Sequence, residues 1–281
     1  MAWAECEVLM SKNTMLRIIS AAILLAILVL CIYFGRIPTL SFVFVAGILI
    51  QYEIFKNFLK FKPFGFISII SMVMFTLVFW FNAKGTTSFQ NTILALGLVV
   101  DILFIIYLFA TKIDSTVVKD HWIKFPLSLP FLLTIFISCV GQLINLPNWK
   151  LLIGLVLFVN FGMDTGAWLI GKNFGKHKLW KSVSPSKTLE GLLGGVLFSS
   201  VLGTLYWKQF LGETSWAMSL IFGLLGVFSQ VGDLVQSKVK RQFAIKDSSS
   251  LIPGHGGVYD RVDSLMFVTP MFLVMYKYFY F

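Results

Sequence analysis

Residues 92–110 read TILALGLVVDILFIIYLFA, and the single charged side chain in this run is Asp101. A helix needs about 20 apolar residues to cross the hydrocarbon core of a bilayer, so the run predicts a membrane-spanning helix. Asp101 stands alone at this depth and is interpreted as a packed, hydrogen-bonded residue without a further role.

Eight more apolar runs of similar length flank this one and explain the composition of the chain. Of its 281 residues, 57% are hydrophobic and 13% are charged, whereas about 25% of the residues in a soluble domain are charged. We therefore expect an all-α, polytopic integral membrane protein with about nine transmembrane helices. The predicted spans are residues 16–34, 38–55, 64–81, 92–110, 125–145, 151–171, 188–207, 216–235 and 262–281.

The basic residues predict the orientation of these spans. Of 23 lysines and arginines, 18 precede the first span or lie in the loops after spans two, four, six and eight, such as Lys56 and Lys124. The other 5, such as Lys84, lie in the alternate loops or near the C-terminus. Cytoplasmic loops carry the excess of Lys and Arg, so the N-terminus is expected inside. The protein is predicted to be a multi-pass protein of the cell (inner) membrane.

The net charge of +10 is spread over short loops, which argues against a nucleic-acid partner. Cys6, Cys31 and Cys139 are far apart and form no CxxC pair, so no disulfide or zinc site is expected. Residues 1–281 are interpreted as a single membrane domain. Its N-terminal helical part is 1–150, and its C-terminal part, 151–281, contains the two longest cytoplasmic loops, 172–187 and 236–261.

Six acidic residues share one level in the predicted topology. A carboxylate in a spanning segment costs about 2.5–3.5 kcal/mol and is a functional-site hypothesis by default. An interfacial acid paired with a nearby lysine remains the alternative for any single one, but the clustering favours a site. The residues at the cytoplasmic ends of their helices are Glu53, Asp164, Glu190, Asp233, Asp260 and Asp263.

The acids near the end of the chain have the chemistry of a magnesium site. Asp260 and Asp263 are three residues apart at a predicted helix start, so both face the same side. Together with Asp233 from the preceding span, they supply the hard oxygen ligands that Mg²⁺ prefers. The sequence therefore predicts a Mg²⁺ cofactor, with a second cation left open.

The same segment also has the features of a phosphate-binding site. Glycines at positions 254, 256 and 257 allow backbone amides to approach a phosphate closely. A basic loop attracted to anionic lipid would explain the lysines, but not the interleaved acids and glycines. The pattern predicts phosphoryl or nucleotidyl transfer. The fixed cations available to bind phosphates are Lys240, Arg241, Lys246 and Arg261.

Residues 237–263, SKVKRQFAIKDSSSLIPGHGGVYDRVD, resemble the signature of the phosphatidate cytidylyltransferases, or CDP-diacylglycerol synthases. A second block, residues 164–191, DTGAWLIGKNFGKHKLWKSVSPSKTLEG, is similar to the same family. The resemblance is specific in the C-terminal half and rests only on the pattern of spans in the N-terminal half. The chain departs from the family pattern at Gln236, where glutamate is usual, and at Ser249, where glycine is commoner.

The resemblance implies that CTP and phosphatidate are converted to CDP-diacylglycerol and pyrophosphate at a cytoplasm-facing site among the membrane lipids. It also suggests a homodimer. His255 is interpreted either as a proton donor or as a residue that orients its loop. The expected catalytic residues are Asp233, Asp260, Asp263, Lys240, Arg241 and Arg261, of which the three aspartates hold Mg²⁺. The expected substrate-binding residues are Asp164, Ser184, Lys187, Lys246, Asp247, His255, Gly256 and Gly257.

Three alternatives stay open at this stage. A CTP-dependent lipid kinase would use similar metal and phosphate chemistry, and a cytidylyltransferase could act on a different lipid phosphate. A transporter is the alternative from another class. Transporter sites usually lie near the midplane of the membrane between inverted repeats, whereas these acids lie at one face and no repeat is visible.

Overall fold

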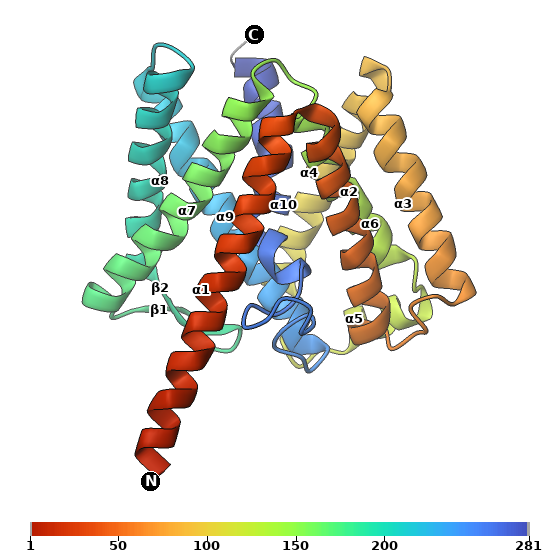
Figure 1. Cartoon of the computed structure of the whole chain (residues 1–281), viewed down its shortest axis with the longest axis vertical. Coiled ribbons are helices and arrows are strands. Elements are labelled where there is room, and N and C mark those ends of the chain that lie inside the picture. Colours follow the sequence, from red (N-terminus) through yellow and green to blue (C-terminus); the bar gives the residue numbers. More distant parts are fainter. Residues whose placement is uncertain (1, 280–281) are drawn as a thin grey trace.

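The computed structural model describes the backbone of residues 2–279 and the side chains of residues 15–278. Cys6, which is named above, and Lys12, one of the 18 basic residues counted above, fall outside the described side chains. The chain forms a bundle of long helices that run back and forth between two ends; α1 begins at the lower end and α10 finishes at the upper end (Figure 1). The elements are α1 (Ala2–Phe34), α2 (Arg36–Glu53), η1 (Ile54–Phe58), α3 (Phe66–Lys84), α4 (Thr87–Ala110), α5 (Val117–Lys124), α6 (Ser128–Leu143), α7 (Trp149–Phe174), β1 (Lys178–Trp180), β2 (Ser184–Thr188), α8 (Leu189–Phe210), α9 (Trp216–Gln242) and α10 (Tyr259–Phe279).

The predicted class, an all-α polytopic membrane protein, is confirmed. Among the described residues, seven helices are long and apolar enough to cross a membrane, and the bent pair α5–α6 would make eight. Helix α10 is not one of them; it starts with Tyr259 and carries Asp260 in its first turn and Lys277 in its last turn. It nevertheless passes through the middle of the bundle (Figure 1) and buries Phe267, Val268 and Leu273. The count of nine spans stays a prediction.

Three local features differ from the sequence-based expectation. The predicted fifth span, 125–145, contains α6, and a separate short helix, α5, precedes it at a 91° bend. The predicted loop 236–261 begins as helix, because α9 continues to Gln242. The predicted loop 172–187 contains a small antiparallel pair, β1–β2. As a result, Lys240 and Arg241 lie on a helix and Lys187 lies on a strand.

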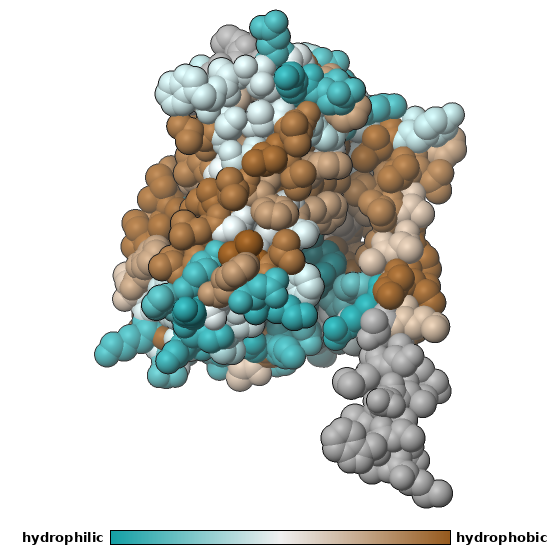
Figure 2. Space-filling model, turned by 90° about the vertical axis from the view of Figure 1, so that its left-hand side faces the viewer, coloured by the Kyte–Doolittle hydropathy of each residue, from teal (hydrophilic) through white to brown (hydrophobic). Residues whose placement is uncertain are grey.

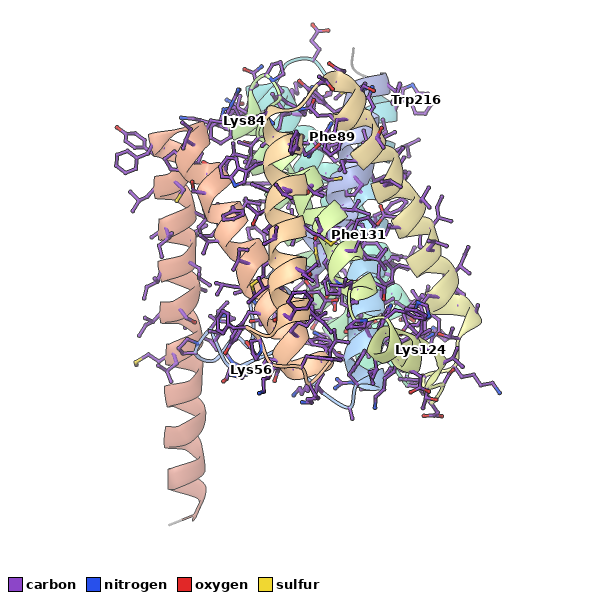
Figure 3. All side chains as sticks on the ribbon, turned by 90° about the vertical axis from the view of Figure 1, so that its right-hand side faces the viewer. Lys56, Lys84, Phe89, Lys124, Phe131 and Trp216 are labelled. Atoms are coloured by element: carbon purple, nitrogen blue, oxygen red, sulfur yellow. The ribbon has the colours of Figure 1, made fainter. Side chains whose placement is uncertain are left out.

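The surface agrees with a membrane location and with the predicted sidedness of the loops. Figure 2 shows a belt of hydrophobic side chains between two more hydrophilic ends. Exposed apolar residues such as Ile102, Phe109 and Leu197 belong to helices that form the bundle. Lys56 and Lys124 lie toward one end of the molecule and Lys84 lies at the other (Figure 3), as the alternation of basic loops predicts.

Close helix packing brings the acid-bearing helices together. A Cβ atom on Gly232 of α9 would lie 3.0 Å from the Asp263 carbonyl oxygen and from the Phe267 side chain of α10. A Cβ atom on Gly166 of α7 would lie 2.7 Å from the Gly194 carbonyl oxygen of α8. Small residues allow helix backbones in membrane proteins to approach in this way. Gly232 is therefore needed for the short distance between α9 and α10 beside Asp233.

The interpretation of Asp101 was half right. Its side chain is packed, with 2% exposure, but neither carboxylate oxygen has a hydrogen-bond partner within the described part of the chain. The expected hydrogen bonding is therefore wrong there. The reason is that α4 packs mainly apolar side chains at this level, including Phe104 against Phe136 and Phe267.

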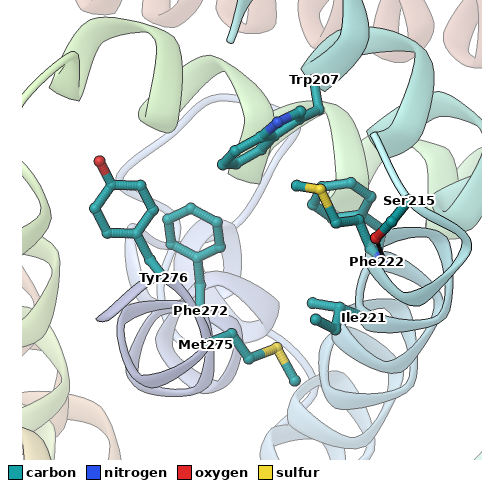
Figure 4. A pocket seen from close by; sticks show the side chains of 8 residues that line it. Trp207, Ser215, Ile221, Phe222, Phe272, Met275 and Tyr276 are labelled. Atoms are coloured by element: carbon teal, nitrogen blue, oxygen red, sulfur yellow. Dashed lines mark hydrogen bonds between the residues drawn. The ribbon is translucent and has the colours of Figure 1, made fainter. Parts of the chain in front are cut away.

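An apolar cavity of about 140 Å³ lies toward the upper end of the bundle. Figure 4 shows the rings of Trp207, Phe222 and Phe272 around it, with Ile221 and Met275 closing one side. Its lining comes from the end of α8, the start of α9 and the second half of α10. It therefore lies at the opposite end from the acids considered next.

Candidate active site

Most of the predicted acids gather around one polar cavity of about 350 Å³. Helices α7, α9 and α10 and the loop between α9 and α10 line it, and that loop lies at the lower end of the bundle (Figure 1). The tertiary structure thus joins residues from four separate segments of the C-terminal half. The lining residues are Asp164, Asp233, Lys240, Asp247, Asp260, Arg261, Asp263 and Ser264.

Helix α9 presents Asp233, Ser237 and Lys240 on one face, because residues four and seven positions apart stack along a helix. Ser237 Oγ donates to Asp233 Oδ1 at 3.2 Å. Lys187 Nζ of β2 lies 2.5 Å from Asp233 Oδ2. Lys187 was predicted to bind substrate; here it is held beside the cavity by an acid of the neighbouring helix.

Asp260 is the most fully engaged of the three predicted metal ligands. Its Oδ1 accepts a hydrogen bond from Lys240 Nζ at 2.8 Å. Its Oδ2 accepts from Ser248 N at 2.8 Å, Ser248 Oγ at 2.9 Å and Gly257 N at 2.9 Å. A buried carboxylate needs such partners to offset its desolvation. Asp260 therefore ties the α9–α10 loop to α9, and its assignment as a metal ligand stays a prediction.

Asp263 and Asp233 are the acids that face the cavity together. Asp263 Oδ1 accepts from the backbone N–H of Ser264 at 2.9 Å. Asp233 lies close enough to repel the carboxylates of both Asp263 and Asp164. Such mutual repulsion favours a divalent cation or a basic group between the acids. Among the described residues, no three His, Cys, Asp or Glu side chains are arranged as a metal cage.

Glycines shape the loop between α9 and α10. Gly254 and Gly256 have φ angles of 75° and 86°, a region that side chains disfavour. A Cβ atom on Gly256 would lie 2.6 Å from Asp260 Oδ2. The Gly257 N–H donates to Asp260, so this amide supports the carboxylate. That Gly256 and Gly257 bind substrate phosphate stays a prediction.

His255 does not line the cavity; it contacts the first helix. Its Nδ1 lies 2.7 Å from Ser20 Oγ, and the same hydroxyl contacts the Pro253 carbonyl oxygen at 3.0 Å. This geometry is that of a residue that orients its loop, one of the two roles considered for it. Burial, with the nearby guanidinium groups of Arg261 and Arg17, lowers the pKa of the His255 imidazole.

The lowered pKa of His255 predicts a pH effect on stability. The ordinary pKa is 6.5, so the unfolded chain takes up this proton before the folded chain does as the pH falls. Stability is then greatest above about pH 6.5 and decreases below it. Thermal unfolding is measured in detergent at pH 7.5 and at pH 5.5. The melting temperature should decrease less between these two pH values for His255→Gln than for the wild type. Equal losses in both proteins would contradict this role.

The remaining predicted residues lie outside the cavity lining. Arg241 Nη1 donates to the Ile245 carbonyl oxygen at 3.4 Å, and Lys246 is exposed. Ser184 pairs with Trp180 in the β1–β2 pair. Their roles toward substrate stay predictions, and Gln236 is buried in α9 and is not among the residues that line the cavity.

Sequence reasoning gave no role to several polar residues that support the site. Ser237 follows Asp233 by four residues, a spacing that on a helix indicates contact. Ser248 donates to Asp260, and nothing in its local sequence marks it. Glu53 was noticed only by its depth, yet it binds the α9–α10 loop.

Two of the three lysines in the signature, Lys238 and Lys240, have different partners. Lys240 faces Asp260 and the cavity. Lys238 points to the end of α4, where its Nζ donates to the carbonyl oxygens of Tyr107, Leu108 and Thr111. A lysine at the C-terminal end of a helix satisfies carbonyl groups that lack helical partners. Lys238 therefore fixes α4 to α9 and is structural.

Comparisons with known proteins agree with this geometry. The sequence profile of the "Cytidylyltransferase family" matches residues 15–279. The chain is 47% identical over 114 residues to proteins named phosphatidate cytidylyltransferase from Staphylococcus aureus and Staphylococcus epidermidis. It is 45% identical to the protein of that name from Staphylococcus haemolyticus. Each alignment covers 40% of this chain and 44% of the relative, so the matched segment spans less than half of each protein.

Proposed function

We propose, because the chain belongs to the cytidylyltransferase family, that it transfers the cytidylyl group of CTP to phosphatidate. The products are CDP-diacylglycerol and pyrophosphate. The observation that carries this proposal is the polar cavity in which five aspartates, Lys240 and Arg261 meet at one end of an apolar bundle. A cavity at that level is open to a charged nucleotide and close to lipid head groups.

The reaction needs little help from a general base. The second pKa of a phosphate monoester is about 6, so the lipid phosphate is already largely dianionic near neutral pH. One of its oxygens forms a bond to the α-phosphorus of CTP as the bond to the departing pyrophosphate breaks. The protein must align these groups and neutralise their negative charge.

Basic residues around the cavity suit that task. Arg261 belongs to the cavity lining and is exposed, so its guanidinium group can bind a phosphate through two parallel hydrogen bonds. Lys240 is held by Asp260 and supplies a fixed positive charge. Lys187, beside Asp233, is a third cation near the acids. Arg241 and Lys246 lie further out and would contact the triphosphate from the solvent side.

Asp233 and Asp263 are the residues best suited to hold Mg²⁺. Mg²⁺ is usually bound by one or two carboxylates, with waters and substrate phosphates completing its ligands, so two facing aspartates are sufficient. Asp164 also lies near Asp233 and would suit a second cation. Bound there, Mg²⁺ would neutralise phosphate charge during the transfer.

The proposed function also implies an orientation of the protein in the membrane. The end of the bundle that carries the cavity would face the cytoplasm, because the loops richest in Lys and Arg lie there. CTP would enter from the cytoplasm, and phosphatidate would enter from the surrounding leaflet of the cell (inner) membrane. A homodimer remains a further expectation from the family resemblance.

Labelled nucleotides test the proposal directly. Purified protein is incubated with Mg²⁺, phosphatidate and CTP labelled at either the α- or the γ-phosphorus. We expect α-label in a CDP-lipid product and γ-label in pyrophosphate. A γ-label in the lipid would instead identify a CTP-dependent lipid kinase.

A panel of acceptors completes this test. Phosphatidate is compared with isoprenoid-based lipid phosphates of equal charge under the same conditions. Preferential labelling of another acceptor would replace phosphatidate as the substrate. The absence of label in every lipid would overturn the proposed transfer.

A further inference from the structure

Glu53, at the end of α2, is a buried carboxylate that binds the loop before α10. Its side chain has 0% exposure. Its Oε1 accepts hydrogen bonds from Ser249 Oγ at 2.7 Å and Val258 N at 2.8 Å. Its Oε2 accepts from Tyr259 N at 3.0 Å and shares the single Ser248 hydroxyl proton with Asp260, at 3.0 Å from Ser248 Oγ. All four donors belong to the segment 248–259, about 200 residues further along the chain.

The two backbone donors lie at the start of α10. The first N–H groups of a helix have no partner within the helix, and a carboxylate there is favoured by the helix dipole. Glu53 thus caps α10 from another helix. Asp260 follows Tyr259 directly, and Asp263 lies about one helical turn further along. The cap therefore sets the position of both acids.

The surroundings of Glu53 strengthen the same attachment. Asn57 Nδ2 of η1 donates to the Ser248 carbonyl oxygen at 2.6 Å, and the Phe58 ring packs on the Tyr259 ring at 5.6 Å. These residues belong to a π-helical turn, Ile54–Phe58, directly after Glu53. Such turns occur often at functional sites.

Gly257 leaves the space that the carboxylate occupies. A Cβ atom at this position would lie 2.5 and 2.6 Å from the two Glu53 oxygens and 2.0 Å from Ser248 Oγ. Ser248 Oγ in turn lies between Glu53 and Asp260, at 2.9 Å from Asp260 Oδ2. A continuous polar path therefore joins Glu53 through Ser248 and Asp260 to Lys240.

We propose that Glu53 is a positioning residue for the transfer reaction. It holds the segment 248–259 so that Asp260 orients Lys240 and Asp263 faces Asp233 across the cavity. Glu53 does not line the cavity and acts through the loop. This inference rests on the proposed function, and it gives the N-terminal half of the chain a part in the active site.

Glu53→Gln is the sharpest test, because it preserves the size of the side chain. The amide group of glutamine would point its N–H donors at the N–H and O–H donors of the loop. At least one donor of the loop would then lose its hydrogen-bond acceptor. We expect a decrease in kcat of about 100-fold, the size of effect that a displacement of about 1 Å at a reacting group produces. Glu53→Asp keeps both acceptor oxygens and should fall between the wild type and Glu53→Gln.

Gln51→Leu is the matched control on the same helix. Gln51 is equally buried, but its partners are Pro130, Thr134 and Ser71, outside the loop. Gln51→Leu should lower the melting temperature at least as much as Glu53→Gln does. The kcat of the folded Gln51→Leu protein should stay within about twofold of the wild-type value. Hydrogen–deuterium exchange should increase across 248–259 in Glu53→Gln alone.

The outcomes separate this inference from the proposed function. A wild-type protein that forms no CDP-lipid would overturn the proposed function, whereas unchanged exchange of 248–259 in Glu53→Gln would overturn the inference whatever the activity. Wild-type turnover in Glu53→Gln, or equal losses of turnover in Glu53→Gln and Gln51→Leu, would also overturn it.

Discussion

Asp263→Asn is expected to lower turnover by about 1,000-fold or more while leaving the thermal stability unchanged or higher. Loss of a metal ligand removes several kcal/mol of charge stabilisation, and each 1.36 kcal/mol corresponds to a factor of ten in rate. The folded state loses little, because Asp263 lies near the like charge of Asp233. Turnover and melting temperature of the same preparation are the two measurements.

A magnesium titration tests whether the lost turnover of Asp263→Asn comes from weaker Mg²⁺ binding. The remaining activity of Asp263→Asn should require a higher Mg²⁺ concentration than the wild type does. Glu213→Gln is the matched control, since Glu213 is exposed in the loop between α8 and α9 at the other end of the bundle. An Asp263→Asn protein with full turnover at the wild-type Mg²⁺ concentration would remove Asp263 from the metal site.

Lys240→Met is expected to have the largest effect on stability. Lys240 and Asp260 form a pair with side-chain exposures of 11% and 4%. Removal of one partner of a buried pair leaves an uncompensated charge and typically costs about 3–5 kcal/mol. The free energy of unfolding should fall by roughly that amount, and turnover should be lost as well because the cation faces the cavity.

A double-mutant cycle tests whether this cost comes from the pair. Asp260→Asn should lower the free energy of unfolding less in the Lys240→Met background than in the wild type. In that background the substitution removes the carboxylate charge that Lys240→Met leaves unpaired. Lys187→Met is the comparison: its pair with Asp233 is more exposed, at 18% and 31%, and should contribute less to stability. Additive losses for Lys240→Met and Asp260→Asn would show that the two side chains do not act as a pair.

The sequence alone determined the class of the fold and the end of the bundle at which most of the predicted acids gather. Hydrophobicity is a local property, so runs such as 92–110 identify spanning helices without knowledge of their neighbours. The acids could be assigned to one end of the bundle for the same reason, and Asp233, Asp260 and Asp263 do reach one cavity. The signature residues also predicted the family that the profile matches.

Only the tertiary structure decided which of these residues contact each other and which supports another. Asp260 and Asp263 look alike in the sequence, yet one is held by four donors and the other faces Asp233. Glu53 binds the loop between α9 and α10, which lies 195 or more residues further along the chain. Lys238 points away from the cavity and donates to a carbonyl oxygen near the end of α4. Such contacts depend on how helices pack against one another, and local periodicity carries no information about a partner from a distant helix.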